Sequence, residues 1–197
     1  MKMTLTTFKF GSVALLGLLA LGLPRAQADA NDPRDNHGEL KHGERKFLLK
    51  AAEGSTNEVA LSRVAVERAQ DPAVREFAQR MIRDHEALNM KVKDLAGRKN
   101  VDITEAVQKG MEKDVDSLRH KPAAEFDQAY LDDMLSGHKD AIELFEKAAL
   151  DARDMEIATL ASETLPTLFE HYRHVRRLDH RAEHEGDHDV SAPPPPQ

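Results

Sequence analysis

The segment from Asp71 to Ala96 constrains the fold of this chain most, because its apolar side chains recur on a single stripe of a helix. The stripe consists of Val74, Phe77, Ala78, Met81, Ile82, Val92 and Leu95. His85 falls on the same stripe. Because a helix of this kind buries its apolar stripe against other helices, the segment predicts a helix over about 72–97 with a histidine on its buried side.

Three further segments repeat this pattern, and each carries one polar residue among its apolar ones. They cover about 44–69, 122–150 and 155–178, and the polar residues are Glu58, His138 and His171. A weaker amphipathic stretch at about 104–119 predicts a short crossover helix between two hairpins. Strand patterns are missing, so we expect an all-α four-helix bundle of two helical hairpins, with the bundle domain over 44–178.

Residues 1–28 have the layout of an export signal: a basic start, an apolar run over 11–23 and a small-x-small site at 26–28. We expect cleavage after Ala28, which places the mature protein in the periplasm or outside the cell. A retained anchor is the less favoured alternative, because the run is shorter than the ~20 residues that a membrane span needs. The polar segment 29–43 is expected to be a flexible leader.

The composition excludes several classes of function. The chain has no cysteine, so neither disulfides nor a thiol nucleophile is available. Its formal net charge is −7, and loss of Lys2, Lys9 and Arg25 with the signal takes the mature chain to −10. Nucleic acid is therefore not an expected partner, whereas metal cations are. Phosphate-binding loops and hydrolase motifs are missing, which favours a binding or structural protein over an enzyme.

The four polar residues on the apolar stripes form the candidate site. Glu58 lies 13 residues before the corner at Asp71 and His85 lies 14 after it, so both are about 20 Å from that corner. Buried groups of this kind must pair with each other or with a bound ion. Imidazole together with carboxylate suits Zn, Fe, Mn or Cu. One interpretation is therefore a single transition metal ion on Glu58, His85, His138 and His171, although the residues alone favour it less than a network without metal.

A network without metal is the alternative, in which Glu58 accepts hydrogen bonds from the imidazoles. Tyr130 lies two turns before His138 and is expected to support the cluster with a phenol hydrogen bond. Counted from the corner near Ala152, His138 and His171 differ in height by about one turn, ~7 Å, which a kink at Pro166 would have to compress.

The two acidic neighbours of His85, Asp84 and Glu86, are expected to be surface charges, because they lie off the apolar stripe.

The segment 179–197 is expected to be a disordered tail, rich in histidine, acidic residues and finally proline. His180, His184 and His188 are spaced four apart and would line one side of a helix, a pattern that binds Zn, Ni or Cu weakly. The alternative is a solvated, fraying chain end without such a role.

Four runs of residues resemble a known family. They are FLLKAAEGSTNEVAL from Phe47, FAQRMIRDH from Phe77, EFDQAYL from Glu125 and TLPTLFEH from Thr164. Together they resemble domain of unknown function 4142, an exported bacterial family grouped with ferritin-like bundles. The resemblance spans about 44–178 and implies a ferritin-like four-helix bundle in the cell envelope, without an established activity.

Ferritin-like di-iron enzymes carry a Glu-x-x-His pair on each of two helices. Here Ile82 and Leu168 stand three residues before His85 and His171, so both pairs are broken. A standard di-iron centre is therefore not expected. The first hypothesis is an exported ferritin-like binding protein whose polar centre holds one metal ion. The alternative is a structural or stress-protective envelope protein that acts through its acidic surface.

Overall fold

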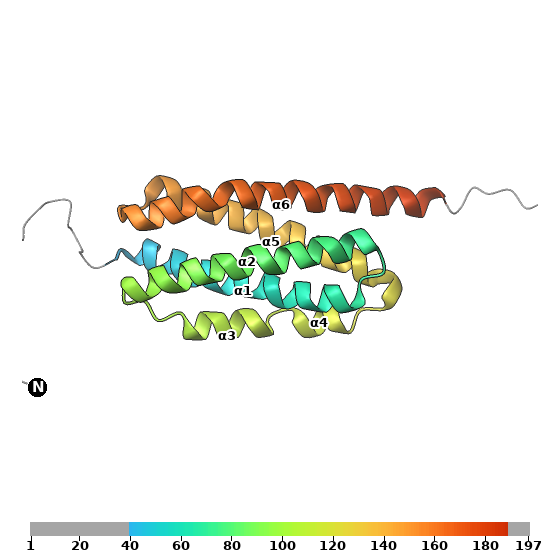
Figure 1. The fold of residues 1–197 in the computed structure, drawn as a ribbon, viewed down its shortest axis with the longest axis horizontal. Helices are drawn as coiled ribbons and strands as arrows, with labels where there is room; N and C mark the ends of the chain where they lie inside the picture. The colour runs from blue at the N-terminus through green and yellow to red at the C-terminus, as the bar shows by residue number, and fades with distance from the viewer. Residues whose placement is uncertain (1–39, 189–197) are drawn as a thin grey trace, which may run out of the picture. The chain divides into compact units, whose positions relative to one another are not determined.

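The computed structural model describes the chain from residue 40 to residue 188, with side chains described as far as residue 181. Within this range the chain forms six helices and no strand, as Figure 1 shows. They are α1 (His42–Arg68), α2 (Pro72–Arg98), α3 (Thr104–Glu112), α4 (Val115–Arg119), α5 (Ala123–Asp151) and α6 (Met155–His188). The predicted all-α four-helix bundle is confirmed.

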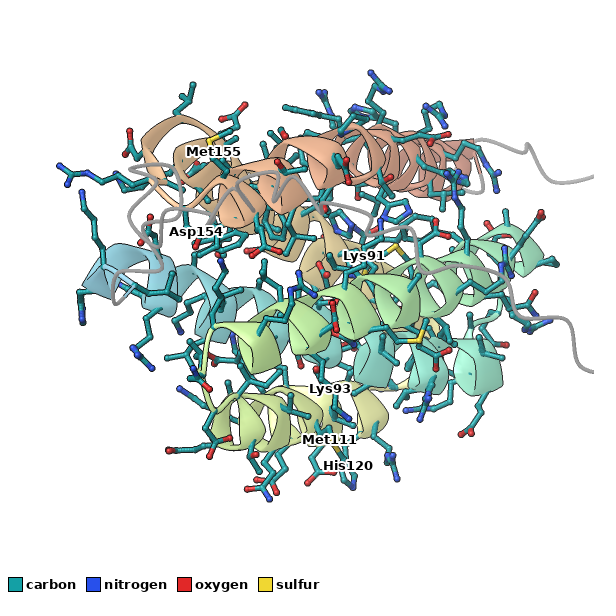
Figure 2. The ribbon with its side chains drawn as sticks, turned by 60° about the vertical axis from the view of Figure 1, so that its left-hand side comes forward. Lys91, Lys93, Met111, His120, Asp154 and Met155 are labelled. Carbon is teal, nitrogen blue, oxygen red and sulfur yellow. The ribbon has the colours of Figure 1, made fainter. Side chains whose placement is uncertain are left out.

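The bundle consists of two hairpins, α1–α2 and α5–α6. Helix α5 packs along α1, and α6 packs along α2, so the four long helices enclose a common interior. The crossover helices α3 and α4 lie on the outer side of the first hairpin, against α1 (Figure 1). Lys93 of α2 projects toward this crossover, whereas Lys91 projects toward α6 (Figure 2).

The two corners of the bundle are fixed by carboxylates. Asp71 caps α2 by accepting the backbone N–H of Ala73 at 2.8 Å, and Pro72 occupies the first helical position, as such a corner requires. Asp127 of α5 accepts the backbone N–H of Asp71 at 2.7 Å. At the other end, Glu44 of α1 accepts the backbone N–H groups of Arg153 and Asp154 in the α5–α6 corner at 2.7 and 2.9 Å. Each hairpin therefore holds the corner of the other.

Two expected helix boundaries are wrong. The crossover is two helices instead of one, broken at Lys113 and Asp114, where Asp114 adopts a positive φ of 58°. Helix α6 does not end near Leu178 but continues to His188, because no proline lies between Leu178 and residue 193 and Arg181 pairs with Asp71 at 2.7 Å. The boundary expected at residue 179 therefore falls inside α6.

Several expectations fall on residues outside the described range. They concern the export signal over 1–28, nearly all of the leader over 29–43, and the side chains of His184 and His188. Among the described helices, none is both long enough and apolar enough to cross a bilayer.

The interior has two apolar cores with a polar layer between them. One core uses residues 47–52 of α1, 88–96 of α2, 142–148 of α5 and 157–168 of α6. The other uses residues 61–69, 74–81, 126–134 and 175–178 of the same four helices. In every helix the gap between the two sets contains one of the four candidate residues, Glu58, His85, His138 and His171.

Glycine 110 sets the distance between the crossover and the bundle. A Cβ atom at Gly110 would lie 2.3 Å from the backbone oxygen of Glu53 in α1, so only glycine permits this approach. Gly54, in the middle of α1, has open space around its missing side chain.

We expect Gly110→Ala to lower the free energy of unfolding by about 1–3 kcal/mol, because the backbone of α1 cannot move away cheaply. Gly54→Ala is the matched control and should raise it by roughly 0.5–1 kcal/mol, since alanine is the better helix former. Urea unfolding measures both values. Equal effects of the two substitutions would contradict the packing described for α3.

Candidate metal centre

The four expected residues meet in the interior, one from each long helix. Glu58 of α1 is 5% exposed, His85 of α2 is 2% exposed, and His138 of α5 and His171 of α6 are fully buried. Within each hairpin the two residues lie at a similar distance along the helix axis from the corner, because similar lengths of chain separate them from it.

The expected height difference between His138 and His171 does not keep them apart. Their ring centroids are 5.4 Å from each other, and both rings lie 5.4–5.6 Å from the ring of His85. The corner residues 152–154 are not helical, so the count along the chain exaggerated the rise. The helices themselves leave a mismatch of only about 4.5 Å, which side chains of this length can bridge.

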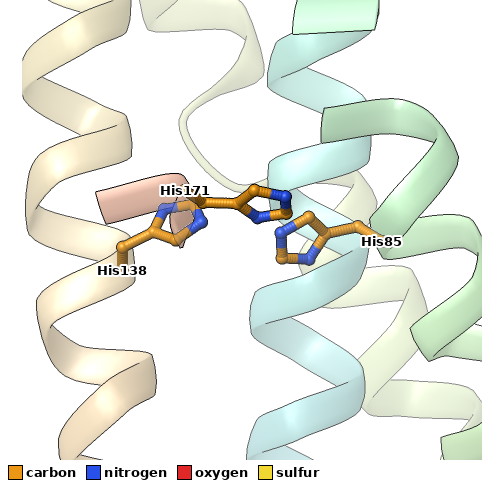
Figure 3. A group of neighbouring side chains, drawn as sticks. All are labelled: His85, His138 and His171. Carbon is orange, nitrogen blue, oxygen red and sulfur yellow. The ribbon is translucent and has the colours of Figure 1, made fainter. Parts of the chain in front are cut away.

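The three imidazoles form a compact group. One nitrogen from each ring lies within 4.8 Å of one from each of the others. Figure 3 shows the rings pointing toward one another from three helices. Three nitrogens around a tetrahedral zinc ion stand about 3.3 Å apart, so each would have to move by less than ~1 Å to bind one.

The outward nitrogens of His138 and His85 face hydrogen-bond acceptors. His138 Nδ1 lies 2.8 Å from the backbone oxygen of Met134, which can only accept, so this nitrogen carries the hydrogen. His85 Nδ1 lies 3.2 Å from Ser55 Oγ and 3.1 Å from Glu58 Oε2. Because Ser55 donates its own hydrogen to the backbone oxygen of His85, both neighbours favour a hydrogen on His85 Nδ1.

The third imidazole is oriented by Asp84, which the sequence pattern assigned to the surface. His171 Nε2 lies 2.8 Å from Asp84 Oδ2. That assignment is wrong because Asp84 stands one residue before His85 on α2 and so faces α6, where His171 lies. Its adjacency to His85 was the signal that could have identified it. The expected surface role of Glu86 is confirmed, since it pairs with Arg63 at 2.7 Å on the exposed face.

All three inward nitrogens are left without a partner. His85 Nε2, His138 Nε2 and His171 Nδ1 are buried and make no hydrogen bond within the described part of the chain. With the hydrogens on the outward nitrogens, each inward nitrogen presents a lone pair. Three unpaired acceptors in an apolar interior are costly, and a hydrogen-bond donor or a metal ion among the rings would satisfy them.

Glu58 and Tyr130 do not take the places expected for them. Glu58 lies against the Nδ1 atoms of His85 and His138, at 3.1 and 3.3 Å, and so supports the rings from behind instead of joining the inward group. The Tyr130 hydroxyl bonds to Ser62 Oγ at 2.8 Å and not to an imidazole. The ligand set that the geometry offers is therefore three histidines. Outer partners of this kind hold metal-binding imidazoles in position.

Burial keeps the imidazoles of His85 and His171 neutral at physiological pH. It lowers the pKa of His85 well below its usual value, and the neighbouring His138 and His171 lower it further. Burial also lowers the pKa of His171 to about 4, although Asp84 opposes the shift. The pKa of Glu58 is raised by burial, against the influence of His138. Neutral imidazole is the form that binds metal.

The tail histidines are separate from this group. His180 is exposed near the end of α6, and the side chains of His184 and His188 are not described. Weak metal binding there stays a prediction from the sequence.

We expect the metal-free protein to lose stability as the pH falls from about 6.5 toward 4. A histidine whose folded pKa is depressed binds fewer protons folded than unfolded, so its contribution is intact above the unfolded pKa and falls below it. Each such histidine contributes a slope of up to about 1.4 kcal/mol per pH unit. The raised pKa of Glu58 gives the opposite slope above pH 4.5.

Urea unfolding at pH 7, 6 and 5 measures this slope for the wild-type protein and for His171→Gln. The variant isolates one histidine and should show the shallower pH dependence. Identical slopes for the two proteins would contradict the depressed pKa of His171.

Comparison with known proteins gives a family and a fold. No curated protein matches the chain. A solved structure, described as a DUF305 fragment from Deinococcus radiodurans, is similar with a TM-score of 0.63 and 20% identity, over 73% of this chain and 99% of that one. At this identity the likeness concerns the fold alone.

A family model described as a domain of unknown function, DUF4142, matches residues 29–178. The matched range contains Glu58, Asp84 and all three histidines of the buried group. The resemblance noted in the four sequence runs is thereby confirmed, and the chain belongs to the DUF4142 family.

Proposed function

We propose that this protein binds one divalent transition-metal ion on His85, His138 and His171. Glu58, Asp84 and the backbone oxygen of Met134 are the outer partners that hold the rings. Metal binding and any role that depends on it, such as capture or buffering of the ion, are the function that the geometry supports best. The proposal is limited to binding of the ion.

The observation that carries this proposal is the set of three buried ring nitrogens without hydrogen-bond partners, grouped within 4.8 Å. A metal-free network accounts for the hydrogen bonds of the outward nitrogens, which face Ser55, Glu58, Asp84 and a backbone oxygen. It leaves the inward lone pairs directed at one another. A bound cation satisfies all three at once.

The donor set narrows the choice of metal. Three imidazole nitrogens suit Zn, Cu or Fe. Manganese, which prefers oxygen ligands, becomes less suitable once Glu58 stands behind the rings instead of among the ligands. Three protein ligands also leave coordination positions open to water or another small ligand.

Export to the periplasm is part of the proposal and rests on the layout of residues 1–28. An exported chain meets its metal outside the cytoplasm. A site made of histidine nitrogens, in a chain without cysteine, does not depend on whether thiols are reduced or oxidised there.

We expect the full mature chain, purified without a tag and with His180, His184 and His188 replaced by glutamine, to bind one equivalent of Zn²⁺ or Co²⁺. Replacing the tail histidines removes their separate contribution without shortening α6. His171→Gln should weaken binding by more than the roughly 10–100-fold that loss of an outer partner costs, and Asp84→Asn by an amount within that range. Titration calorimetry and the visible spectrum of Co²⁺ measure these affinities.

The matched control is His174→Gln, one turn further along α6, where the ring packs against Phe77 at a centroid distance of 5.0 Å. It should leave the affinity unchanged. Binding of less than a tenth of an equivalent by the tail-silenced protein, in which His180, His184 and His188 are replaced by glutamine, would overturn the proposal. It would favour a structural protein that acts through its acidic surface.

A further inference from the structure

Two cavities reach the polar layer from opposite seams of the bundle. One lies between α1 and α5, has a volume of about 350 Å³ and is lined at its inner end by Glu58, Gly137 and His85. The other lies between α2 and α6, has a volume of about 360 Å³ and is lined at its inner end by His85 and His171. Either could connect the buried histidines with solvent, so the charges and free polar atoms along each one decide between them.

The α1/α5 cavity is lined by a residue with a carboxylate oxygen that accepts no hydrogen bond within the described part of the chain. Glu58 Oε1 makes no hydrogen bond among the described residues, although its side chain is 94% buried. A Cβ atom at Gly137 would lie 3.0 Å from this oxygen, so the glycine leaves the oxygen open at the cavity wall. Glu58 Oε1 is also 3.3 Å from His138 Nδ1. The free oxygen thus stands between the cavity and the rings.

Carboxylates continue outward from Glu58 along this cavity. Asp133 is half-buried, with Asp114 and Asp132 but also Lys113 and Lys121 among the charges that act on it, and Asp140 is exposed at the surface. Three lysines, Lys46, Lys50 and Lys113, also line the cavity, and Lys50 is paired with Glu53 at 2.9 Å. The lining holds four carboxylates against three lysines, so its net charge attracts a cation.

The α2/α6 cavity is closed by a cation of the protein itself. Arg80 of α2 contacts Asp84 at 3.3 Å and spans the seam to Glu170 of α6 at 2.9 Å. Lys91, also in its lining, projects toward α6 (Figure 2). Its remaining acidic groups are Asp84, which is bonded to His171, and Glu163. The lining of this cavity therefore holds as many basic as acidic side chains and offers an entering cation no net attraction.

We propose that metal ions reach the three histidines through the α1/α5 cavity, with Glu58 Oε1 as a transient ligand on the way. This rests on the proposed metal-binding function and adds a route and a role for Glu58. The ion passes Asp140 and Asp133, binds the free oxygen of Glu58 and transfers to the inward nitrogens. Glu58 then remains as the outer partner of His85 and His138.

Stopped-flow capture of Co²⁺ by the tail-silenced full chain tests this route, with equilibrium affinity measured in parallel. Ala141→Phe fills the α1/α5 cavity and should slow capture at least tenfold while the affinity changes less than about twofold. Ala87→Phe makes the same substitution in the α2/α6 cavity and should leave the rate unchanged. Circular dichroism checks that both variants fold.

The double variant Asp133→Asn, Asp140→Asn keeps the cavity and removes its outer charges. It should slow capture about 3–10-fold at low ionic strength, and the difference should vanish at high salt. If Ala141→Phe does not fold, the capture rate of this double variant tests the proposed route by itself.

The route is overturned if the affinity is normal and these substitutions leave the capture rate unchanged, or if Ala87→Phe slows capture equally. Either result is compatible with metal binding by the three histidines. A wild-type protein that binds no Co²⁺ at equilibrium overturns both.

Discussion

Four ionisable side chains are buried in one layer of the bundle, and the surrounding structure is arranged to satisfy them. Apolar residues fill the interior above and below the layer, so water cannot solvate it from either end. Each polar atom must then find a partner within the layer or beside it. The partners that the protein supplies are a serine hydroxyl, two carboxylates and a backbone oxygen. Together they fix the orientation of all three rings.

The direction of these hydrogen bonds decides the chemistry of the layer. Acceptors stand behind every ring, so the hydrogens sit on the outward nitrogens and the lone pairs point inward. With their depressed pKa values, His85 and His171 are neutral and present lone pairs. The three histidines together form a group that could hold a metal ion. The same acceptors in front of the rings would have produced a hydrogen-bond network instead.

The fold was predictable because it depends on patterns that are local in the chain. The apolar stripes of α1, α2, α5 and α6 have the period of a helix, and the Asp71-Pro72 corner carries its own cap and first-turn residue. Two boundaries were missed for reasons outside the local pattern. The left-handed backbone at Asp114 splits the crossover, and the contact between Arg181 and Asp71 extends α6 along the first hairpin.

The sequence by itself determined that Glu58, His85, His138 and His171 lie on buried stripes, and that Glu58 and His85 share one level, because stripe position and distance from a corner set these properties. Only the tertiary structure decided their roles. In the folded chain Glu58 contacts the outward nitrogens of His85 and His138, Tyr130 bonds to Ser62, and Asp84 bonds to His171. These contacts join residues 27 to 87 positions apart, and no periodicity along one helix records which way a side chain on another helix points.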